Sequence, residues 1–424
     1  MRKLHLICNA HIDPCWQWDL EEGIGAALST FRCAADFCEE YPSLIFNHNE
    51  AMVYQWVEQY EPDLFKRIKK LIEQGRWHVM GGWYLQPDCN LTSGESLVRH
   101  ILKGKAYFYE KFGVTPKTAM NVDSFGHTRG LVQILRQSGY DSYIFCRPFQ
   151  KDMYLENDVF IWKGYDGSEV TGIRLYGIYN SLYGKACEKI KNWLENHKNQ
   201  QLGCIFWGVG DHGGGPSRVD LNNIEEFCRE NKNEMAIIHS YPEAYCHEAQ
   251  ERKYGYPIWE KGLNHWGAGC YTSMVQIKQK HREVEAQYFQ TEKIASHTAI
   301  MCGEAYPKEQ LDEALTALMF VQFHDILPGT AIKKVEETGL RKLSYAADKG
   351  SIPIFIYNPH PYNVEDIFEC EFMLENMNTS GSFKNPVIYQ KGVRVISQCE
   401  KEDSNYPIKK KKKVVFQATL MPSQ

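Results

Sequence analysis

Long apolar runs are missing from this sequence. Its 424 residues contain no uninterrupted apolar stretch of about 20 residues, the length that a membrane-spanning helix needs, so we expect no transmembrane segment. The apolar stretch that follows Arg2 and Lys3 is also too short for a signal peptide. We therefore expect a cytoplasmic protein that does not bind a membrane.

Paired cysteines and a strong net charge are missing as well. None of the 14 cysteines forms a Cys-x-x-Cys pair, which argues against a zinc finger or a thioredoxin-like motif and favours reduced thiols. The formal net charge of −5 gives no reason to expect a nucleic acid partner. What the chain does have is length and 43% hydrophobic residues, enough for a large core and two or three domains.

The first 255 residues alternate short apolar runs with amphipathic segments. This alternation is typical of an α/β fold with a mainly parallel sheet, which we expect to close into a seven-stranded (β/α) barrel-like domain over residues 1–255. The pair Asp166-Gly167 between two apolar runs predicts a hairpin. Strands are predicted at Leu4–Asn9, Trp77–Met80, Thr118–Val122, Ser142–Cys146, Cys204–Trp207 and Ala236–Ser240, and helices at Pro62–Ile72, Leu97–Phe112, Leu131–Gln137, Ile190–Asn196 and Val219–Glu230.

Two further segments follow this α/β part. Residues 256–348 are expected to form a helical bundle, with helices at Ser273–Met301, Lys308–His324 and Ile332–Ala347. Residues 349–424 begin with a strand-like run, Ile352–Tyr357, and continue as strand-like segments separated by Gly, Asn, Ser and Pro. They are expected to form a partial β-rich domain, the start of a β-sandwich that normally needs about 100 residues.

Histidine and carboxylate side chains follow three of the predicted strands. His11 and Asp13 follow the first strand, Asp123 follows the strand that starts at Thr118, and Asp211 follows a later one. Because ligand sites in such folds collect beyond the carboxyl ends of the strands, we expect these side chains to form one site. Residues i and i+2 of an extended segment point to the same side, so His11 and Asp13 can meet one metal ion.

Each of these motifs also has a plainer interpretation. A His-x-Asp pair occurs often by chance in loops, and Asp123 could cap a helix N-terminus. The glycine-rich loop around Asp211 does not match a phosphate-binding P-loop and could be a turn without function. His324, which precedes a Pro-Gly turn, could end a helix and interact with its dipole. Residue patterns alone leave these alternatives open.

Taken together, the motifs resemble family 38 of the glycoside hydrolases, the retaining α-mannosidases. The family has a His-x-Asp-x-x-Trp motif, an Asp-x-Phe-Gly motif, an acid/base carboxylate in a glycine-rich loop, and a His-Asp pair followed by Gly-Thr. Residues 86–96 further resemble its bacterial-type branch. The likeness runs from about residue 3 to 365. Family members continue into a large β-sandwich region that is mostly missing here, so the resemblance implies a C-terminally truncated chain. The matching residues are His11, Asp13 and Trp16; Asp123, Phe125 and Gly126; Asp211; and His324, Asp325, Gly329 and Thr330.

The resemblance implies a metal-dependent retaining α-mannosidase that removes terminal α-linked mannose from oligosaccharides by double displacement. Residues 1–255 would then be the catalytic domain, and one Zn²⁺ per chain would be the cofactor. By this resemblance Asp123 is the nucleophile and Asp211 the general acid/base. The implied metal ligands are His11, Asp13, Asp123 and His324, and the implied substrate contacts are Trp16, Phe125, Arg147 and Asp325.

Two other functions remain as alternatives. A zinc-dependent polysaccharide deacetylase also uses an α/β barrel, but it draws ligands from a His-x-x-x-His-type pair, which this sequence lacks. A mannose-binding protein with an inactive site would not need every expected catalytic residue, and all of them are here. The expected partner is an α-mannoside oligosaccharide, and a homo-oligomer is left open, as is the linkage that would be cleaved.

Overall fold

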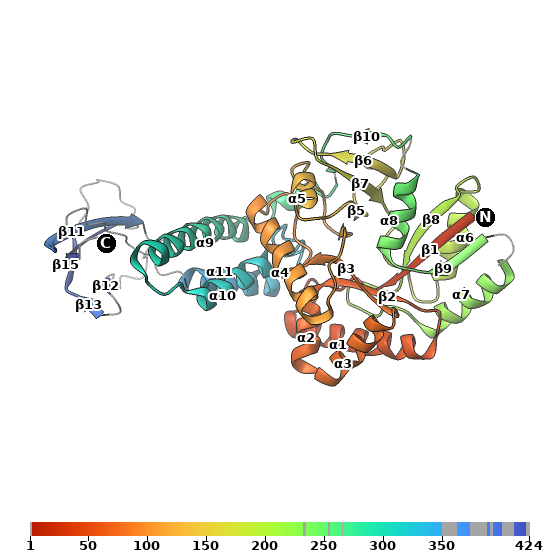
Figure 1. The fold of residues 1–424 in the computed structure, drawn as a ribbon, viewed down its shortest axis with the longest axis horizontal. Helices are drawn as coiled ribbons and strands as arrows, with labels where there is room; N and C mark the ends of the chain where they lie inside the picture. Colours follow the sequence, from red (N-terminus) through yellow and green to blue (C-terminus); the bar gives the residue numbers. More distant parts are fainter. Residues whose placement is uncertain are drawn as a thin grey trace. The chain divides into compact units, whose positions relative to one another are not determined.

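The computed structural model describes residues 2–231, 235–252, 255–264, 266–349, 363–373, 388–390, 393–400 and 411–420. The chain forms two compact units, each built from two separate stretches. The first unit comprises Met1–Ala286 and Glu313–Asp348, and the second comprises Gln287–Asp312 and Lys349–Gln424. All residues that the sequence predicts to bind a metal or a substrate belong to the first unit (Figure 1).

A parallel sheet contains the N-terminal strand of the first unit. Within it β1 pairs in parallel with β2, β8 and β9, and β2 pairs in parallel with β3. Residues 4–9 of β1 are all buried, as expected for a parallel strand that is covered on both faces. The strands are β1 (Arg2–Asn9), β2 (Phe46–Glu50), β3 (Trp77–Trp83), β8 (Leu202–Trp207) and β9 (Met235–His239).

A second sheet has the strand order β10-β6-β7-β5-β4. Strands β4, β5 and β7 run parallel, and the antiparallel pair β6–β7 confirms the hairpin predicted around Asp166. Strands β3 and β4 lie side by side, so the two sheets adjoin. The fold is therefore mixed α/β with parallel strands that fit a barrel-like domain, while the count of seven strands stays a prediction. The members are β4 (Thr118–Asn121), β5 (Ser142–Phe145), β6 (Val159–Lys163), β7 (Glu169–Arg174) and β10 (Ile258–Trp259).

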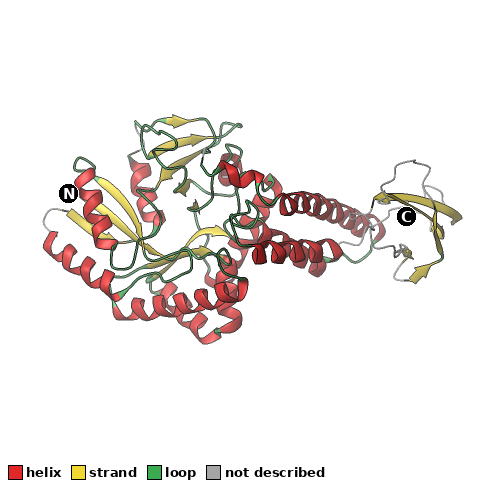
Figure 2. Ribbon diagram, turned by 180° about the vertical axis from the view of Figure 1, so that it is seen from behind, coloured by secondary structure: helices red, strands yellow, loops and turns green. Residues whose placement is uncertain are grey.

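Helices pack against both sheets of the first unit: α1–α3 lie along the sheet that contains β1, whereas α5 packs against β7 of the second sheet (Figures 1 and 2). The helix predicted at Leu131–Gln137 is confirmed without change as α5, and the helix predicted at Leu97–Phe112 is found at Gly94–Phe112 as α4. At the start of α4 the Ser93 hydroxyl accepts from the backbone amide of Ser96, and at its end Gly113 has the left-handed φ of 69°. These helices are α1 (Leu20–Glu40), α2 (Ala51–Tyr60), α3 (Pro62–Glu73), α4 (Gly94–Phe112), α5 (Leu131–Gln137), α6 (Ala186–Asn196), α7 (Arg218–Asn231) and α8 (Pro242–Glu251).

The predicted helical segment consists of a short 3₁₀ helix, η1 (Ala268–Thr272), and of α9 (Val275–Cys302), α10 (Lys308–Val321) and α11 (Lys333–Lys349). The expected end of α10 at His324 is wrong, because the helix ends at Val321. Beyond it the backbone bonds to another segment instead, with the amide of Asp88 donating to the carbonyl of Gln322. His324 therefore does not lie in a helix terminus, which removes the helix-dipole interpretation.

The described strands of the second unit are antiparallel. Strands β11 (Val364–Met373), β15 (Lys411–Leu420) and β14 (Ser397–Glu400) form one sheet, and β12 (Ile388–Gln390) pairs with β13 (Val393–Val395). The strand predicted at 352–357 lies outside the described residues, and the β-sandwich stays a prediction. Among the helices in the described part of the chain, none is long and apolar enough to cross a membrane.

Candidate functional site

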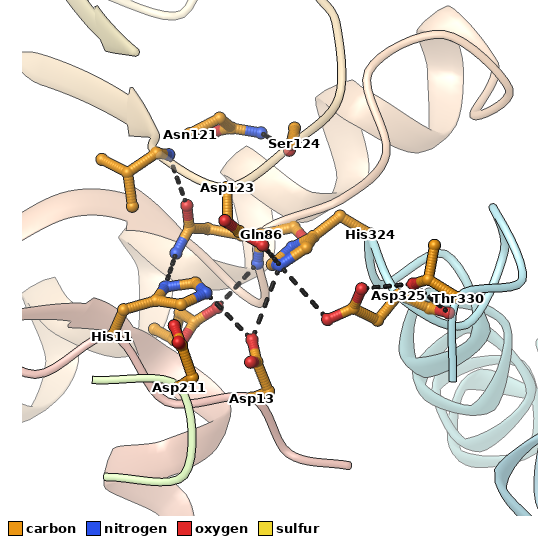
Figure 3. A network of polar contacts seen from close by, with 12 residues as sticks. His11, Asp13, Gln86, Asn121, Asp123, Ser124, Asp211, His324, Asp325 and Thr330 are labelled. Carbon is orange, nitrogen blue, oxygen red and sulfur yellow. Dashed lines mark hydrogen bonds and ion pairs between the residues drawn. The ribbon is translucent and has the colours of Figure 1, made fainter. Parts of the chain in front are cut away.

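The carboxyl ends of three strands bring the predicted side chains to one place (Figure 3). His11 and Asp13 follow β1, Asp123 follows β4, and Asp211 follows β8. His324 reaches the same place from the segment after α10, which an isolated antiparallel bridge between Pro87 and Phe323 holds. The site therefore joins residues that are more than 300 positions apart in the chain.

The ring of His324 lies at the centre of the group. Its Nε2 is 3.6 Å from Oδ1 of Asp13 and 3.5 Å from Oδ2 of Asp123, and Nε2 of His11 is 2.9 Å from Oδ1 of Asp13. Asp325 is also near, with Oδ2 3.9 Å from the same His324 nitrogen. All these side chains are buried. The structure thus places the four predicted metal ligands in two groups that share His324, one with His11 and Asp13 and one with Asp123 and Asp325.

Buried polar atoms without partners mark the middle of this group. Nε2 of His11, Nε2 of His324 and Oδ1 of Asp13 have no hydrogen-bond partner of acceptable geometry among the described residues. An unsatisfied buried polar atom is costly, and a bound ion is one way to satisfy it. Ligands bonded to zinc at about 2.1 Å lie about 3.0–3.4 Å from one another, close to the separations found here. The residues present therefore fit a divalent cation.

The buried histidines and carboxylates shift one another's pKa values. Burial alone would raise the pKa of Asp13, but the neighbouring His11 and His324 rings outweigh it and lower that pKa to about 2. Burial alone would lower the pKa of each histidine, but mainly Asp13 outweighs it for His11, and Asp13 and Asp325 do so for His324, so both values are raised. A cation that enters must displace protons from these rings.

Gln86 supports both rings. Its side-chain Nε2 lies 3.1 Å from Nδ1 of His11, and its backbone carbonyl oxygen lies 3.0 Å from Nδ1 of His324. Its side-chain oxygen accepts from the backbone amide of Val122 at 2.9 Å. The backbone amide of Gln86 donates to the buried carboxyl group of Glu50 at 3.1 Å. A carbonyl oxygen only accepts, so His324 carries its hydrogen on Nδ1 and its Nε2 lone pair faces the ligand group. Neither Gln86 nor Glu50 was predicted to do this.

Asp211 is held from two sides. The hydroxyl of Tyr179 donates to Oδ1 at 2.7 Å, and the amide of Asn180 donates to Oδ2 at 3.4 Å. Its backbone amide donates to the carbonyl of His11 at 2.8 Å, and its φ of 70° is unusual for a residue other than glycine. The glycine-rich loop thus fixes the carboxyl group beside the His11 segment. The contacts from Tyr179 and Asn180 were not predicted.

Arg147 contacts Asp123 directly. Its Nη1 donates to the Asp123 backbone carbonyl at 3.0 Å and to Oδ1 of the carboxylate. The guanidinium carbon lies 4.4 Å from the centre of the Trp266 ring, and that ring packs 5.1 Å from the ring of Phe125. The predicted residues Arg147 and Phe125 therefore lie beside Asp123. Trp266 completes this wall and was not predicted.

Asp325 lies beside the ligand group, and Trp16 contacts the 322–332 segment through its backbone. The Trp16 carbonyl accepts from the amide of Ile332 at 2.9 Å, and its half-buried ring packs edge-on against Trp18 at 5.8 Å. Asp325 accepts from the hydroxyl of Thr330. Burial, aided by the charge of Asp13, raises the pKa of Asp325 to about 6.

Comparison with known protein families covers most of the chain. The family model described as glycosyl hydrolases family 38 N-terminal domain matches residues 1–266, and the alpha mannosidase middle domain matches residues 265–351. Alpha-mannosidase G of Dictyostelium discoideum is 28% identical over 348 residues, which cover 78% of this chain and 31% of that protein. Human alpha-mannosidase 2C1 is 26% identical over 342 residues, which cover 80% and 33% respectively. The chain spans about a third of the length of these curated relatives.

Solved structures agree on the fold. The crystal structure of an alpha-mannosidase from Enterococcus faecalis matches with a TM-score of 0.76 at 20% identity, over 100% of this chain and 55% of that one. The 4-alpha-glucanotransferase of Thermococcus litoralis matches with a TM-score of 0.58 at 13% identity, over 89% of this chain and 64% of that one. The family model that matches more than half of the residues decides the assignment: the chain belongs to glycosyl hydrolase family 38.

Proposed function

We propose that this chain carries the active site of a zinc-dependent retaining α-mannosidase that cleaves terminal α-linked mannose from oligosaccharides. One observation carries the proposal. The Nε2 atoms of His11 and His324, which lack a hydrogen bond of acceptable geometry, converge with Asp13 and Asp123, within a chain of glycosyl hydrolase family 38. Since the chain spans about a third of its curated relatives, the activity of the whole protein is part of the proposal.

The proposed ligands of one zinc ion are His11, Asp13, Asp123 and His324. Zinc accepts both nitrogen and oxygen ligands, and a bound ion would supply a Lewis acid that holds neighbouring mannose hydroxyls. The buried Gln86 would keep the ligand rings of His11 and His324 in place through their Nδ1 atoms.

Asp123 would attack the anomeric carbon. Its buried carboxylate faces His324 on one side and Arg147 on the other, and both contacts would hold it in one direction. Attack forms the bond between the Asp123 oxygen and the anomeric carbon as the bond to the leaving oxygen breaks. Water then releases mannose with the original configuration, which is the retaining course of two-carboxylate glycosidases.

Asp211 would act as the acid and then as the base. It would donate a proton to the leaving oxygen in the first step and take one from the attacking water in the second. The hydroxyl of Tyr179 and the amide of Asn180 engage both carboxyl oxygens and would fix its direction. Retention requires a separation of about 5–5.5 Å between the Asp123 and Asp211 carboxyl groups.

Trp16, Phe125, Arg147 and Asp325 are the proposed substrate contacts. The rings of Phe125 and Trp16 would cover the apolar face of mannose, and Asp325 would accept from a sugar hydroxyl. The deacetylase and binding-protein alternatives are not favoured by the family assignment. The cytoplasmic location, the homo-oligomer and the division into residues 1–255, 256–348 and 349–424 remain predictions.

The direct test measures hydrolysis of 4-nitrophenyl α-mannoside by the full-length protein. Activity is expected with zinc, is expected to disappear after dialysis against a chelator, and should return when zinc is added back. NMR of the first product should show the α-anomer. A zinc-loaded, folded protein that turns over neither this substrate nor α-linked mannobioses would contradict the proposal, and a β-anomer as first product would contradict retention.

Replacing Asp211 by alanine should make the rate depend strongly on the leaving group. Without a proton donor, cleavage of a mannobiose should fall on the order of 10³-fold, because an alkoxide leaves poorly. Dinitrophenolate needs no proton to leave, so the first step should persist for a dinitrophenyl mannoside. Azide, which needs no general base, should accelerate the second step by attacking the mannosyl-enzyme. Equal losses for both substrates would assign the acid role to another residue.

A further inference from the structure

A buried chain of hydrogen bonds lies behind Arg147, outside the residues proposed above. His127, on the loop after β4, and Tyr143, in β5, are both fully buried. The Tyr143 hydroxyl lies 2.7 Å from Nδ1 of His127, and Nε2 of His127 lies 2.9 Å from the backbone carbonyl oxygen of Arg147. The chemistry proposed above gives neither side chain a task.

The direction of each hydrogen bond follows from the groups themselves. A carbonyl oxygen only accepts, so Nε2 of His127 must carry the hydrogen that it donates to Arg147. Burial lowers the pKa of His127 to about 4, so the ring is neutral and Nδ1 is an acceptor. The phenol of Tyr143, whose pKa burial raises, keeps its hydrogen and donates it to Nδ1. The Arg147 carbonyl therefore selects the Nε2–H tautomer of His127, and Tyr143 stabilises that tautomer by donating to Nδ1.

The place of His127 does not depend on Arg147. Its backbone amide donates to the carbonyl of Leu263 at 2.7 Å, and the Leu263 amide donates back at 2.8 Å. The imidazole ring packs edge-on against the rings of Tyr143 and Phe145, at 5.4 and 5.5 Å. His127 is thus a fixed support, held by its backbone and by β5.

Arg147 is held at both ends by one loop. His127 binds its backbone carbonyl, and Asp123, four residues earlier on the same loop, binds its guanidinium through Nη1. The Trp266 ring, 4.4 Å from the guanidinium carbon, closes one face. Moving the Arg147 backbone would therefore move the group that meets the Asp123 carboxylate.

We propose that His127, in the Nε2–H tautomer that Tyr143 stabilises, is a positioning residue that fixes Arg147 and through it the direction of the Asp123 carboxylate. This inference rests on the proposed role of Asp123 as nucleophile. A misdirected carboxylate weakens attack on a substrate that is already bound, so the effect should fall on kcat more than on KM.

Two replacements of His127 separate its hydrogen bond from its bulk. Glutamine can place an amide N–H near the position of Nε2, whereas asparagine is too short to reach the Arg147 carbonyl. We expect His127→Asn to lower kcat about 100-fold, and His127→Gln to stay within about tenfold of the wild type, with KM changed less than about threefold in both. Equal losses of kcat in the two variants, or no loss in His127→Asn, would overturn the proposal.

Tyr143→Phe tests the first link and has a matched control. It removes the donor to Nδ1, and kcat should fall about tenfold. Tyr140→Phe removes another fully buried hydroxyl, which donates to the carbonyl of Gly81 at 2.9 Å away from Arg147, so kcat should not change. Thermal unfolding of both variants shows whether they lose similar stability. A similar kcat for the two variants would contradict the proposal.

A spectroscopic test does not need turnover. In protein labelled with ¹⁵N-histidine, the His127 signal, identified by its absence in His127→Gln, should have a protonated Nε2 and an unprotonated Nδ1 at pH 7. Tyr143→Phe should shift the Nδ1 resonance most. A protonated Nδ1 would overturn the inference, even if the enzyme is active. If the protein is inactive but His127 has the expected tautomer, the inference about Arg147 stands and the proposed function is wrong.

Discussion

Replacing Asp123 by asparagine is expected to lower kcat/KM for an aryl α-mannoside on the order of 10⁴-fold, the scale on which removal of a catalytic nucleophile acts. An amide does not form the covalent bond to the anomeric carbon, and it leaves the guanidinium of Arg147 without its negative partner. Steady-state rates at saturating zinc measure the loss. In the wild type, acid-quenched turnover should leave mannose attached to the peptide that contains Asp123, detectable by mass spectrometry.

Asp141→Asn is the matched control for this change. Asp141 lies next to the first residue of β5, at the strand end opposite to the site, where its carboxylate accepts from the hydroxyl of Ser142 at 2.8 Å. The same chemical change there should leave kcat/KM within about twofold of the wild type, as expected for substitutions away from a functional site. A folded Asp123→Asn protein with wild-type rates would disprove the nucleophile assignment, and label on another peptide would name the true nucleophile.

Local sequence patterns predicted much of the first unit. Helix α5 follows from its own apolar spacing and from the glycine after it, and its bounds were predicted without error. The strand predicted at Leu4–Asn9 was found at Arg2–Asn9, because a short apolar run bounded by polar residues specifies a buried parallel strand almost by itself. Such elements need only information carried within about ten residues.

The site was predictable where its residues occur in contiguous motifs. His11 and Asp13 are two positions apart on an extended segment, and the glycine-rich loop that contains Asp211 follows directly from β8. The end of α10 was not predictable in this way. Phe323 continues the apolar spacing of the helix, but the backbone of residues 322–323 pairs with residues 87–88 some 230 positions away, and that tertiary pairing outweighs the local helical preference.

The supporting residues had no sequence signal of their own. Gln86 becomes significant only when β1, the segment after β3 and the segment after α10 meet, since it contacts His11 and His324 together. Tyr179 and Trp266 likewise look like ordinary core aromatics until Asp211 and Arg147 lie beside them. Residues that act by holding others are therefore found from the tertiary structure, whereas the groups they hold are found from the sequence.

Replacing His324 by alanine is expected to weaken zinc binding by more than the ~10–100-fold that loss of a group orienting a ligand costs. Its Nε2 lies within 3.6 Å of both Asp13 and Asp123, so its removal takes the shared nitrogen from the centre of the proposed ligand set. Competition with a chromophoric chelator measures the dissociation constant. Because zinc should stabilise the native state by mass action, it should also raise the Tm of the wild type far more than that of the variant.

The protons held by His11 and His324 determine how zinc affinity should change with pH. Carboxylates, Asp13 above all, raise the pKa of His324 and of His11 above its ordinary value of 6.5, so these rings hold protons to a higher pH than a free histidine and must lose them when zinc binds. Zinc affinity should therefore rise with pH through the titration of these rings, and calorimetry in buffers of different ionisation enthalpy should detect released protons. His324→Ala should release fewer protons than the wild type, whereas His197→Ala, on the surface end of α6, should change neither quantity. Zinc binding that is equally tight in His324→Ala and the wild type would show that the cation, if bound, is held elsewhere.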